Sequence, residues 1–349
     1  MNNNSFFSTE ILRWFRENGR DLPWRETRDP YAIWLSEIIL QQTRIAQGWE
    51  YWERFVQTYP KVEDLAAASE DDVLKLWQGL GYYSRARNLH TAAKQIVALG
   101  AFPNTIEGIK SLKGVGDYTA AAIGSFAFDI PAAVVDGNVY RVLSRYFGID
   151  TPINSTQGKK EFAALAQSLL PASDAASYNQ GMMDFGAIQC TPQSPKCLLC
   201  PLAETCEALR CGRVEELPIK NKTVKVKTRH LSYIYIRCKS SAADGAGNSE
   251  PMVAIHRRGE GDIWQGLWEP YNVSDIKELP SFVKNPILLA KDVKHVLTHR
   301  ILLADFYLLE TESRPPLPDD YIWIRESEIE DYGVPRLIEI MLEKINPVE

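Results

Sequence analysis

The amino-acid sequence predicts two domains, an all-α domain followed by a smaller α+β domain. At 349 residues the chain is long for a single domain. Its first half carries apolar residues at helical spacing almost throughout, and its last third carries short runs that suit strands. A charged, lysine-rich stretch with a proline separates the two patterns. We therefore expect a helical domain over 1–212, a linker over 213–229 and an α+β domain over 230–349.

Composition and charge limit the classes of function. The apolar and charged fractions are those of a soluble globular protein, no apolar run is long enough to span a membrane, and the start of the chain lacks a signal-peptide pattern. We expect a cytoplasmic protein and, by default, a monomer. The net charge of −6 argues against bulk attraction to nucleic acid, but it permits a local basic face.

One acidic residue stands out among the first helices. A helix is expected from Tyr31 to about Gln47, and Glu37 lies on it inside the apolar run IWLSEIIL. Burial there would raise the pKa of Glu37 and suit it to act as a general acid. Glu37 also aligns with Gln41 and Arg44 at helical spacing, and such a stripe is usually a solvated face. The sequence leaves both interpretations open.

Further helices are expected over 49–59, 65–78, 84–99 and 105–111. Between two of them lies the turn GLGYY at 79–83, which presents aromatic side chains. It is either a packed helix corner or a wedge for a base stack, where stacking on an aromatic ring is worth about 1–3 kcal/mol per base. Arg85 and Arg87 follow, and their partners would be phosphates or water.

The stretch 111–138 combines a glycine turn, a helix and a carboxylate. Gly114 and Gly116 permit positive φ and close approach of the backbone. The helix expected over 117–128 would then present its free N–H groups as a seat for a phosphate. Asp136 comes just before another amphipathic helix. The alternative is a turn between two core helices with Asp136 as an ordinary N-cap, worth about 1 kcal/mol.

Two more helices, over 156–170 and 175–188, lead to a cysteine-rich loop with the spacing C-x6-C-x2-C-x5-C. Four of the six cysteines lie in this loop, which in a reducing compartment indicates a metal site rather than disulfides. Zinc is one candidate, although its sites usually contain two C-x-x-C pairs and only one pair here has that spacing. A [4Fe–4S] cluster fits at least as well. The ligands would be Cys190, Cys197, Cys200 and Cys206.

Beyond the linker the pattern changes to strands. They are expected over 231–237, 252–257, 302–309 and 321–324, with short helices near 327–329 and 337–345. A polar insertion at 240–250 is expected to form a loop between the first two strands. This half is therefore α+β.

The motifs also occur together in one known family. In chain order they are LPWR at 22–25, SEIILQQT at 36–43, GLGYYSRARNL at 79–89, LKGVGDYTAAAIGSFAF at 112–128, VDGNV at 135–139 and the four-cysteine loop. The first half resembles the helix-hairpin-helix DNA glycosylases, and the whole chain resembles the MutY family of adenine DNA glycosylases. The resemblance implies a helix-hairpin-helix near 105–128 and a [4Fe–4S] cluster in the loop 190–206. It also implies an enzyme of base excision repair that flips adenine out of a mispair with 8-oxoguanine or guanine in double-stranded DNA.

The resemblance implies a role for each matching residue. Glu37 would protonate adenine, which leaves poorly as an anion, and Asp136 would stabilise the oxocarbenium-like sugar. Tyr118 and Asn138 would support the reacting sugar and water. Bifunctional relatives carry a Schiff-base lysine at the position of Tyr118, so a monofunctional glycosylase that leaves an abasic site is expected. The other implied contacts are with the adenine pocket for Leu22, Trp24, Arg25 and Asp184, with the base stack for Gln42 and Tyr82, and with phosphate for Gly114 and Gly116.

The C-terminal half resembles the NUDIX-like domain of the same family, through IWQGLWEP at 263–270 and KHVLTHR at 294–300. That domain would recognise 8-oxoguanine, with Thr298 supplying a hydroxyl hydrogen bond. Leu297 stands where relatives have a stacking aromatic residue, and His299 is by default a core histidine. No pyrophosphohydrolase signature follows Trp268, so nucleotide hydrolysis is not expected.

Two other functions compete with this one. An endonuclease III-like enzyme for oxidised pyrimidines is disfavoured by Tyr118 and by the added C-terminal domain. A DNA-binding iron–sulfur protein without catalytic activity is disfavoured by the presence of both Glu37 and Asp136.

Overall fold

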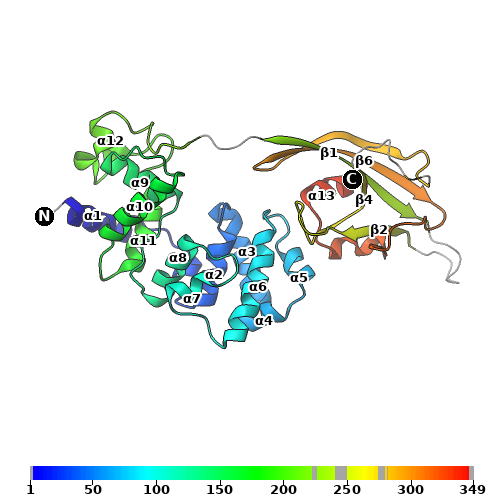
Figure 1. Ribbon diagram of the computed structural model, residues 1–349, viewed down its shortest axis with the longest axis horizontal. Coiled ribbons are helices and arrows are strands. Elements are labelled where there is room, and N and C mark those ends of the chain that lie inside the picture. The colour runs from blue at the N-terminus through cyan, green and yellow to red at the C-terminus, as the bar shows by residue number, and fades with distance from the viewer. Residues whose placement is uncertain (1–2, 222–225, 240–249, 274–279, 281, 346–349) are drawn as a thin grey trace. The chain divides into compact units, whose positions relative to one another are not determined.

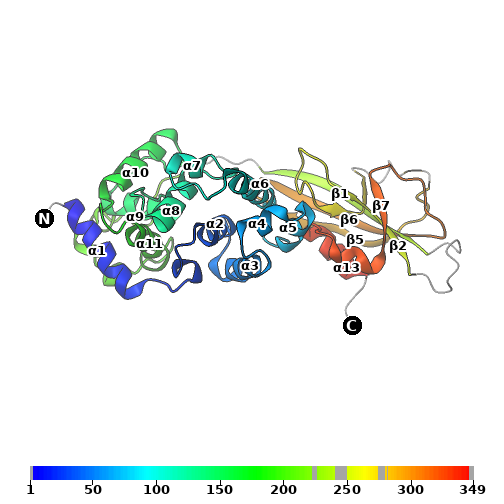
Figure 2. The same cartoon turned by 90° about the horizontal axis from the view of Figure 1, so that it is seen from below.

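The computed structural model describes residues 3–221, 226–239, 250–273, 280 and 282–345 (Figure 1, Figure 2). Contacts divide the chain into a first unit, Met1–Ala66 with Thr91–Lys222, and a second unit, Ala67–His90 with Thr223–Glu349. The second unit therefore joins a segment of the helical half to the C-terminal domain, a grouping that the sequence does not predict. No helix in the described part of the chain is long and apolar enough to cross a membrane.

The first unit is helical, as expected. Its elements, including those that cross into residues 67–90, are α1 (Asn3–Asn18), the 3-10 helix η1 (Pro23–Arg25), α2 (Pro30–Ile39), α3 (Ile45–Thr58), α4 (Val62–Ala67), α6 (Ser84–Leu99), α7 (Ile106–Lys110), α8 (Asp117–Phe128), α9 (Gly137–Phe147), α10 (Thr156–Leu169), α11 (Ala175–Asp184), the π-helical turn η2 (Phe185–Gln189), the 3-10 turns η3 (Cys197–Leu199) and η4 (Ala203–Thr205), and α12 (Glu207–Arg210).

An aromatic core fixes helices that carry residues of the cavity described below. Helix α1 packs along α11 (Figure 2). The ring of Phe7 lies 4.6 Å from that of Tyr146 on α9, and Trp14 meets Phe185 edge-on at 5.0 Å, both measured between centroids. Such pairs add about 0.5–1.5 kcal/mol to the burial of their surface. The C-terminal end of α9 and the end of α11 are thereby both packed against α1.

The helix expected over 31–47 is in fact two helices. Helix α2 ends at Ile39, and the chain then turns through Gln42, whose φ is 56°, before α3 begins. A Cβ at Gly48 would lie 2.6 Å from Cδ2 of Leu40, so a larger residue there would have to displace the Leu40 side chain. The apolar periodicity continued across the turn and concealed it.

The helix expected over 65–78 is likewise divided. Helix α4 ends at Ala67, and Ser69 then caps α5 (Glu70–Leu76) by accepting a hydrogen bond from the backbone N–H of Asp72. A serine followed by three acidic residues favours such a start, because the carboxylates complement the helix dipole.

The hairpin at 105–128 has the expected pair of helices. Thr105 caps α7 through the N–H of Gly108, and α8 begins at Asp117 after the glycine turn. Gly114 has a φ of 80°, as expected, but Gly116 is extended with φ −97° and ψ −178°. The positive φ expected for this motif is therefore found at Gly114 and not at Gly116.

The second unit contains α5 and a seven-stranded sheet with the order β3-β2-β1-β6-β5, in which β4 also pairs with β1 and β7 with β2. Strands β1 and β6 run parallel over Lys227–Cys238 and Arg300–Thr311. The remaining elements are β2 (Met252–Arg257), β3 (Trp268–Glu269), β4 (Tyr271–Val273), β5 (Ile287–Val296), β7 (Tyr321–Arg325), the 3-10 helix η7 (Glu326–Asp331) and α13 (Arg336–Ile345).

Helix α13 covers one face of this sheet (Figure 1). Leu337, Ile338 and Met341 on α13 are fully buried against side chains of β1, β2 and β6. Strand β5 was missing from the sequence prediction, because six of its ten residues are exposed and its pairing with β6 shifts register at two places. The insertion expected at 240–250 lies, apart from Glu250, outside the described residues, as do residues 222–225 of the expected linker.

Candidate active site

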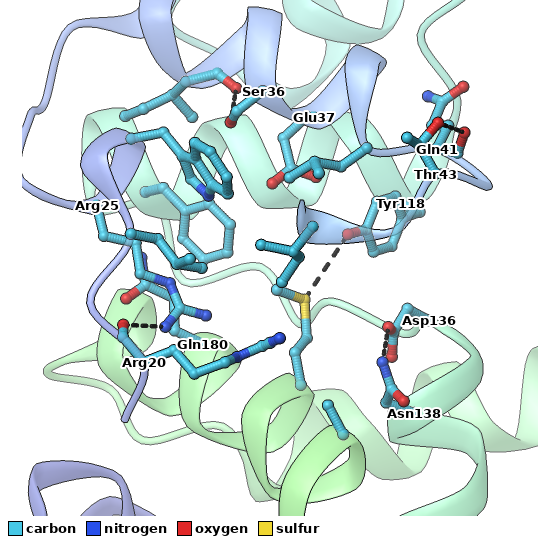
Figure 3. A pocket seen from close by; sticks show the side chains of 18 of the residues that line it. Arg20, Arg25, Ser36, Glu37, Gln41, Thr43, Tyr118, Asp136, Asn138 and Gln180 are labelled. Carbon is cyan, nitrogen blue, oxygen red and sulfur yellow. Dashed lines mark hydrogen bonds between the residues drawn. The ribbon is translucent and has the colours of Figure 1, made fainter. Parts of the chain in front are cut away.

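A cavity of about 480 Å³ opens in the first unit. Its walls come from the loop before α2, from α2 and the turn after it, from the start of α8, from the segment before α9 and from α11 (Figure 3). Among the residues that the sequence assigned to catalysis or substrate, those that line it are Leu22, Trp24, Arg25, Glu37, Gln42, Tyr118, Asp136 and Asn138.

Glu37 projects into the cavity from a helix that is buried nearly all round. Asp29 caps α2 through the N–H of Tyr31, Pro30 occupies its first turn, and every residue from Tyr31 to Ile39 is buried. Glu37 is only 7% exposed. Burial raises its pKa from the ordinary 4.5 to about 7; the nearby charge of Asp136 acts in the same direction, and the Tyr118 hydroxyl opposes it. Glu37 is thus substantially protonated near neutral pH, and the solvated-face interpretation is wrong.

Asp136 is both the N-cap of α9 and a wall of the cavity. Its Oδ1 accepts a hydrogen bond from the N–H of Val139 at 2.8 Å, and its Oδ2 accepts one from Nδ2 of Asn138 at 2.7 Å. Burial raises the pKa of Asp136, but these donors and the charge of Arg141 act against it. Asp136 is therefore the N-cap that one of the two alternatives expected, and its carboxylate also faces the cavity.

Asn138 is held in turn by Arg141, one turn along α9. Nη2 of Arg141 donates to Oδ1 of Asn138 at 2.8 Å and to the carbonyl of Gly186 at 2.6 Å, and Nε donates to the carbonyl of Cys190 at 2.8 Å. A Cβ at Gly186 would lie 2.6 Å from Cβ of Asn138, so glycine permits this close approach. The amide of Asn138 is therefore oriented with its nitrogen toward Asp136.

Tyr118 lies between the two carboxyl groups in Figure 3. It is the second residue of α8, and its hydroxyl interacts with the carboxyl of Glu37 and lies 3.7 Å from Sδ of Met183. Burial and the charges of Glu37 and Asp136 raise its pKa well above the usual range. Tyr118 therefore stays neutral and serves as a hydrogen-bond donor.

Asp184 does not line the cavity but lies behind its wall. Its carboxylate is fully buried and binds both terminal nitrogens of Arg25 at 2.8 Å, as well as the backbone and side chain of Arg20. Burial alone would raise the pKa of Asp184, but the hydrogen bonds from Arg25 and Arg20 hold it below its usual value. Asp184 thus positions two cavity arginines rather than reaching the cavity itself.

The other residues that are predicted to contact DNA lie partly in the first unit and partly in the second. Gln42 lines the cavity with a left-handed backbone, which is uncommon for a residue other than glycine. Gly114 and Gly116 lie in the turn before α8 and not in the cavity wall. Tyr82 and Thr298 belong to the second unit, where their hydroxyl groups are hydrogen-bonded to each other.

The sequence did not single out several cavity residues. Arg20 enters from the loop before η1, and Gln180 and Met183 enter from α11. Arg20 is recognisable only through its partner Asp184, which is far away in sequence, and the α11 residues follow an ordinary amphipathic pattern. No local signal in the sequence would have identified them.

The four predicted metal ligands surround one small cavity of about 30 Å³. Cys190, Cys197, Cys200 and Cys206 are half-buried, and Nη1 of Arg145 donates to Sγ of Cys190 at 3.4 Å. Among the described residues no three His, Cys, Asp or Glu side chains converge as a single metal ion would require. The four cysteine thiols around this common cavity fit a [4Fe–4S] cluster, which takes four cysteine ligands.

Three family models match the chain. Residues 35–171 match the HhH-GPD superfamily base excision DNA repair protein model, residues 190–206 match the iron-sulfur binding domain of endonuclease III, and residues 247–344 match the NUDIX domain. Together these matches cover the part of the cavity that carries Glu37, Tyr118 and Asp136, the cysteine loop and most of the C-terminal domain.

Curated relatives of this chain carry the name adenine DNA glycosylase. The protein of Buchnera aphidicola from Schizaphis graminum is 30% identical over 97% of this chain and 98% of its own length, and that of Buchnera aphidicola from Acyrthosiphon pisum is 39% identical over 75% and 73%. The Mus musculus protein is 42% identical over 61% of this chain and 44% of its own length.

Solved structures resemble the helical part. A thermostable thymine-DNA glycosylase superposes with a TM-score of 0.56 at 34% identity, over 60% of this chain and 97% of its own. A trapped endonuclease III–DNA covalent intermediate superposes with a TM-score of 0.53 at 23% identity, over 61% of this chain and 99% of its own. The second likeness shows the fold alone.

Proposed function

Because this chain belongs to the adenine DNA glycosylase family, we propose that it removes adenine paired with 8-oxoguanine, and more weakly with guanine, from double-stranded DNA. The family assignment gives the coarser activity: the protein is a DNA glycosylase that hydrolyses N-glycosyl bonds and removes adenine in DNA repair. The observation that best supports the mechanism below is that Glu37 and Asp136 face one cavity with unlike environments.

Glu37 is the general acid of the proposed reaction. A protonated carboxyl in the cavity delivers its proton to a ring nitrogen of the flipped adenine, so that the base departs neutral while the electron pair of the N-glycosidic bond passes to it. General acid catalysis contributes about 10²–10⁴-fold to the rate. The raised pKa of Glu37 keeps this proton available near pH 7.

Asp136 is the anion that faces the developing cation. As the N-glycosidic bond breaks, C1′ becomes oxocarbenium-like, and a carboxylate stabilises it or captures it covalently before water adds. The hydrogen bonds from Val139 and Asn138 favour the ionised form of Asp136 that this role needs. The two carboxyl groups thus hold opposite protonation states in one site.

Tyr118 makes the proposed reaction monofunctional. A strand-nicking relative needs an amine that can form a Schiff base with C1′, and a phenol cannot. The neutral hydroxyl of Tyr118, next to Glu37, instead orients the acid and the reacting sugar. The product is an abasic site in an intact strand.

The remaining residues place the DNA. Leu22, Trp24 and Arg25 form the wall that would receive the adenine, and Asp184 positions Arg25. Gln42 and Tyr82 would fill or wedge the stack during base extrusion, a step that costs a few kcal/mol. Gly114 and Gly116 would expose backbone N–H groups to a phosphate, and Thr298 would bind 8-oxoguanine on the opposite strand.

The [4Fe–4S] cluster is the cofactor of this family's cysteine loop. Cys190, Cys197, Cys200 and Cys206 would hold it, and when bound it cross-links the loop through four iron–thiolate bonds. The protein contributes the hydrogen bonds of Arg145 to Cys190 and of Arg141 to the backbone of the same residue.

The choice of opposite base tests the proposal. Single-turnover excision would be measured on one labelled strand in which adenine is paired with 8-oxoguanine, guanine or thymine. We expect the highest rate opposite 8-oxoguanine, a lower rate opposite guanine and little excision opposite thymine. Equal rates for all three duplexes would contradict the proposed specificity and leave only the general adenine glycosylase activity.

A further inference from the structure

The turn at 79–83, which carries the predicted wedge Tyr82, belongs to the same unit as the C-terminal domain. It joins α5 to α6, and both flanking segments contact residues of that domain. The expected function places Tyr82 in the DNA stack and Thr298 at the base opposite the adenine. The contacts that hold Tyr82 and Thr298 together would therefore link insertion into the stack to binding of the opposite base.

Close backbone packing forms the centre of the contact. Leu74 on α5 is 1% exposed, and a Cβ at Gly266 would lie 3.0 Å from its Cδ1. A Cβ at Gly333 would lie 3.4 Å from the backbone nitrogen of Lys75. Gly266 also has a φ of 84°, a conformation that favours glycine. The motif IWQGLWEP thus supplies, in Gly266, one of the surfaces against which α5 packs.

Polar contacts surround this packing. Arg257 binds Glu70 at 2.9 Å and Asp71 at 3.2 Å. Nη1 of Arg87 donates to the carbonyl of Gln265 at 2.5 Å. Three further contacts tie the end of α5 to α13 and the segment before it: the amide of Gln78 with Glu339, the N–H of Val334 with Oε1 of Gln78, and Nζ of Lys75 with the carbonyl of Tyr332.

The turn itself is braced from within the same unit. The guanidinium of Arg85 lies 5.0 Å from the ring centroid of Trp77 and 5.6 Å from that of Tyr82, and it donates to the carbonyls of Leu80 and Gly81. Tyr82 is 47% exposed and has a φ of 48°, which is unusual for an aromatic residue. Arg85 and Arg87 are therefore structural supports of the turn, and the sequence-based expectation that they meet phosphates or water is not needed to explain them.

We propose that these contacts fix Tyr82, the predicted wedge, and Thr298, the predicted contact to the opposite base (the reader), in one rigid body. We call the contacts the α5 clamp. They join Glu70, Asp71, Leu74, Lys75, Gln78 and Arg87 to Arg257, Gln265, Gly266, Tyr332, Val334 and Glu339. The inference rests on the proposed function. If Tyr82 and Thr298 move together, the position at which Tyr82 enters the base stack is set by how Thr298 binds the opposite base. Extrusion of adenine then depends on which base Thr298 contacts. The residues of the clamp are positioning residues, because they act through Tyr82 and Thr298.

Charge reversal at Arg257 tests the clamp. Arg257→Glu places three carboxylates together at its edge, and breaking an exposed ion pair of this kind changes an equilibrium by about 1.4-fold to fivefold. We expect the ratio of single-turnover excision rates, adenine opposite 8-oxoguanine over adenine opposite guanine, to fall by about that factor. We also expect a smaller fluorescence rise from 2-aminopurine placed at the adenine position, which reports extrusion.

Rescue and a matched control separate positioning from damage to the fold. The triple variant Arg257→Glu, Glu70→Lys, Asp71→Lys restores opposite charges and should recover the wild-type rate ratio. Lys239→Glu reverses a charge in the same domain, beside Glu310, and should leave the ratio unchanged. Gln78→Ala removes a different contact of the clamp and should lower the ratio as Arg257→Glu does.

The outcomes distinguish this inference from the proposed function. If the wild-type protein shows no preference for 8-oxoguanine, the proposed function is wrong. If it shows the preference and Arg257→Glu and Gln78→Ala both retain it, the clamp does not couple wedge and reader. If the triple variant stays as impaired as Arg257→Glu, the effect is not one of charge pairing across α5, and the inference is likewise overturned.

Discussion

Asn138 donates a hydrogen bond from its amide nitrogen to Oδ2 of Asp136 at 2.7 Å, and this donor helps to hold the carboxylate ionised against the effect of burial. Removing it in Asn138→Ala should raise the pKa of Asp136, because the charged form loses a hydrogen bond. A raised pKa leaves less of the anion at low pH, so the acidic limb of the excision rate should move to higher pH. The measurement is the single-turnover rate from pH 5 to 8.

A matched control for that prediction is Asn154→Ala. Asn154 donates to the backbone of Asn221 and lies outside the cavity, so its removal should leave the profile unchanged. An unshifted acidic limb in Asn138→Ala would show that Asn138 does not tune Asp136.

Glu37 should set the alkaline limb of the pH dependence of the excision rate. With a pKa of about 7, it is protonated below neutral pH and loses its proton above it, so excision should decline as the pH rises through 7. Glu37→Gln should reduce excision by about 10²–10⁴-fold while leaving binding to the mispair in place, because the shape is kept and the proton is lost. Binding is measured by gel shift, with the exposed Glu63→Gln on α4 as the control. Excision by Glu37→Gln at the wild-type rate would rule out Glu37 as the acid.

The same substitution should stabilise the fold at alkaline pH. In the unfolded chain Glu37 ionises near its ordinary 4.5, whereas in the folded protein it holds its proton to about 7. The folded state therefore loses stability as the pH rises between these values, by about 3 kcal/mol in all at 1.36 kcal/mol per unit. Glu37→Gln removes this loss, so it should unfold at higher temperature than wild type at pH 8 and at a similar temperature near pH 4. Equal melting temperatures at pH 8 would contradict the raised pKa.

Replacing Tyr118 by lysine should introduce strand nicking. The new amine would lie beside Glu37, close to the sugar in the proposed reaction, where it can attack C1′ and form a Schiff base. Borohydride should then trap a covalent protein–DNA complex with Tyr118→Lys and none with Tyr118→Phe. A Tyr118→Lys protein that gives neither nicking nor a trapped complex would count against the placement of residue 118 at the sugar.

Asp184→Asn should destabilise the protein without removing a group that lines the cavity. The carboxylate is fully buried between Arg20 and Arg25, and breaking a buried pair by removing one partner costs about 3–5 kcal/mol. Thermal unfolding measures this loss. Asp129→Asn, which breaks the exposed pair of Asp129 with Arg28, should cost far less. A melting temperature equal to that of the wild type would contradict a stabilising role for the pairing of Asp184 with Arg20 and Arg25.

Loss of a cluster ligand should empty the loop of iron. Cys197→Ser removes one of the four thiolates, so iron per protein should fall, and folding or DNA affinity should fall with it. Cys211→Ser changes an exposed cysteine outside the set and should retain the iron of the wild type. A wild-type protein purified without iron would contradict the cluster assignment.

The sequence predicts most of this molecule because its signals are local. The start of α8 after a glycine turn, the position of Asp136 before a helix and the strands β1, β2, β6 and β7 follow from periodicity and turn chemistry, and the structure confirms them. The buried position of Glu37 was one of two alternatives, because an apolar run shows that a helix is buried but not which way one side chain points.

Other features depend on contacts that the sequence does not reveal. The end of α2 was missed because the apolar spacing continues across the turn into α3 and does not mark the left-handed backbone of Gln42. The role of Asp184 behind the cavity wall follows from its pairing with Arg20 and Arg25 across a long sequence separation. The association of residues 67–90 with the C-terminal domain is of the same kind. Cytoplasmic location, a monomeric state and the individual roles at the site stay predictions.

One measurement tests the central claim most directly. A duplex with adenine opposite 8-oxoguanine, labelled on the adenine strand, is incubated with the wild-type protein and with Glu37→Gln, and each sample is divided before treatment with alkali. We predict that the wild type yields a cleaved strand only after alkali and that Glu37→Gln yields almost none. Cleavage without alkali, or equal cleavage by both proteins, would contradict a monofunctional adenine glycosylase that uses Glu37 as its acid.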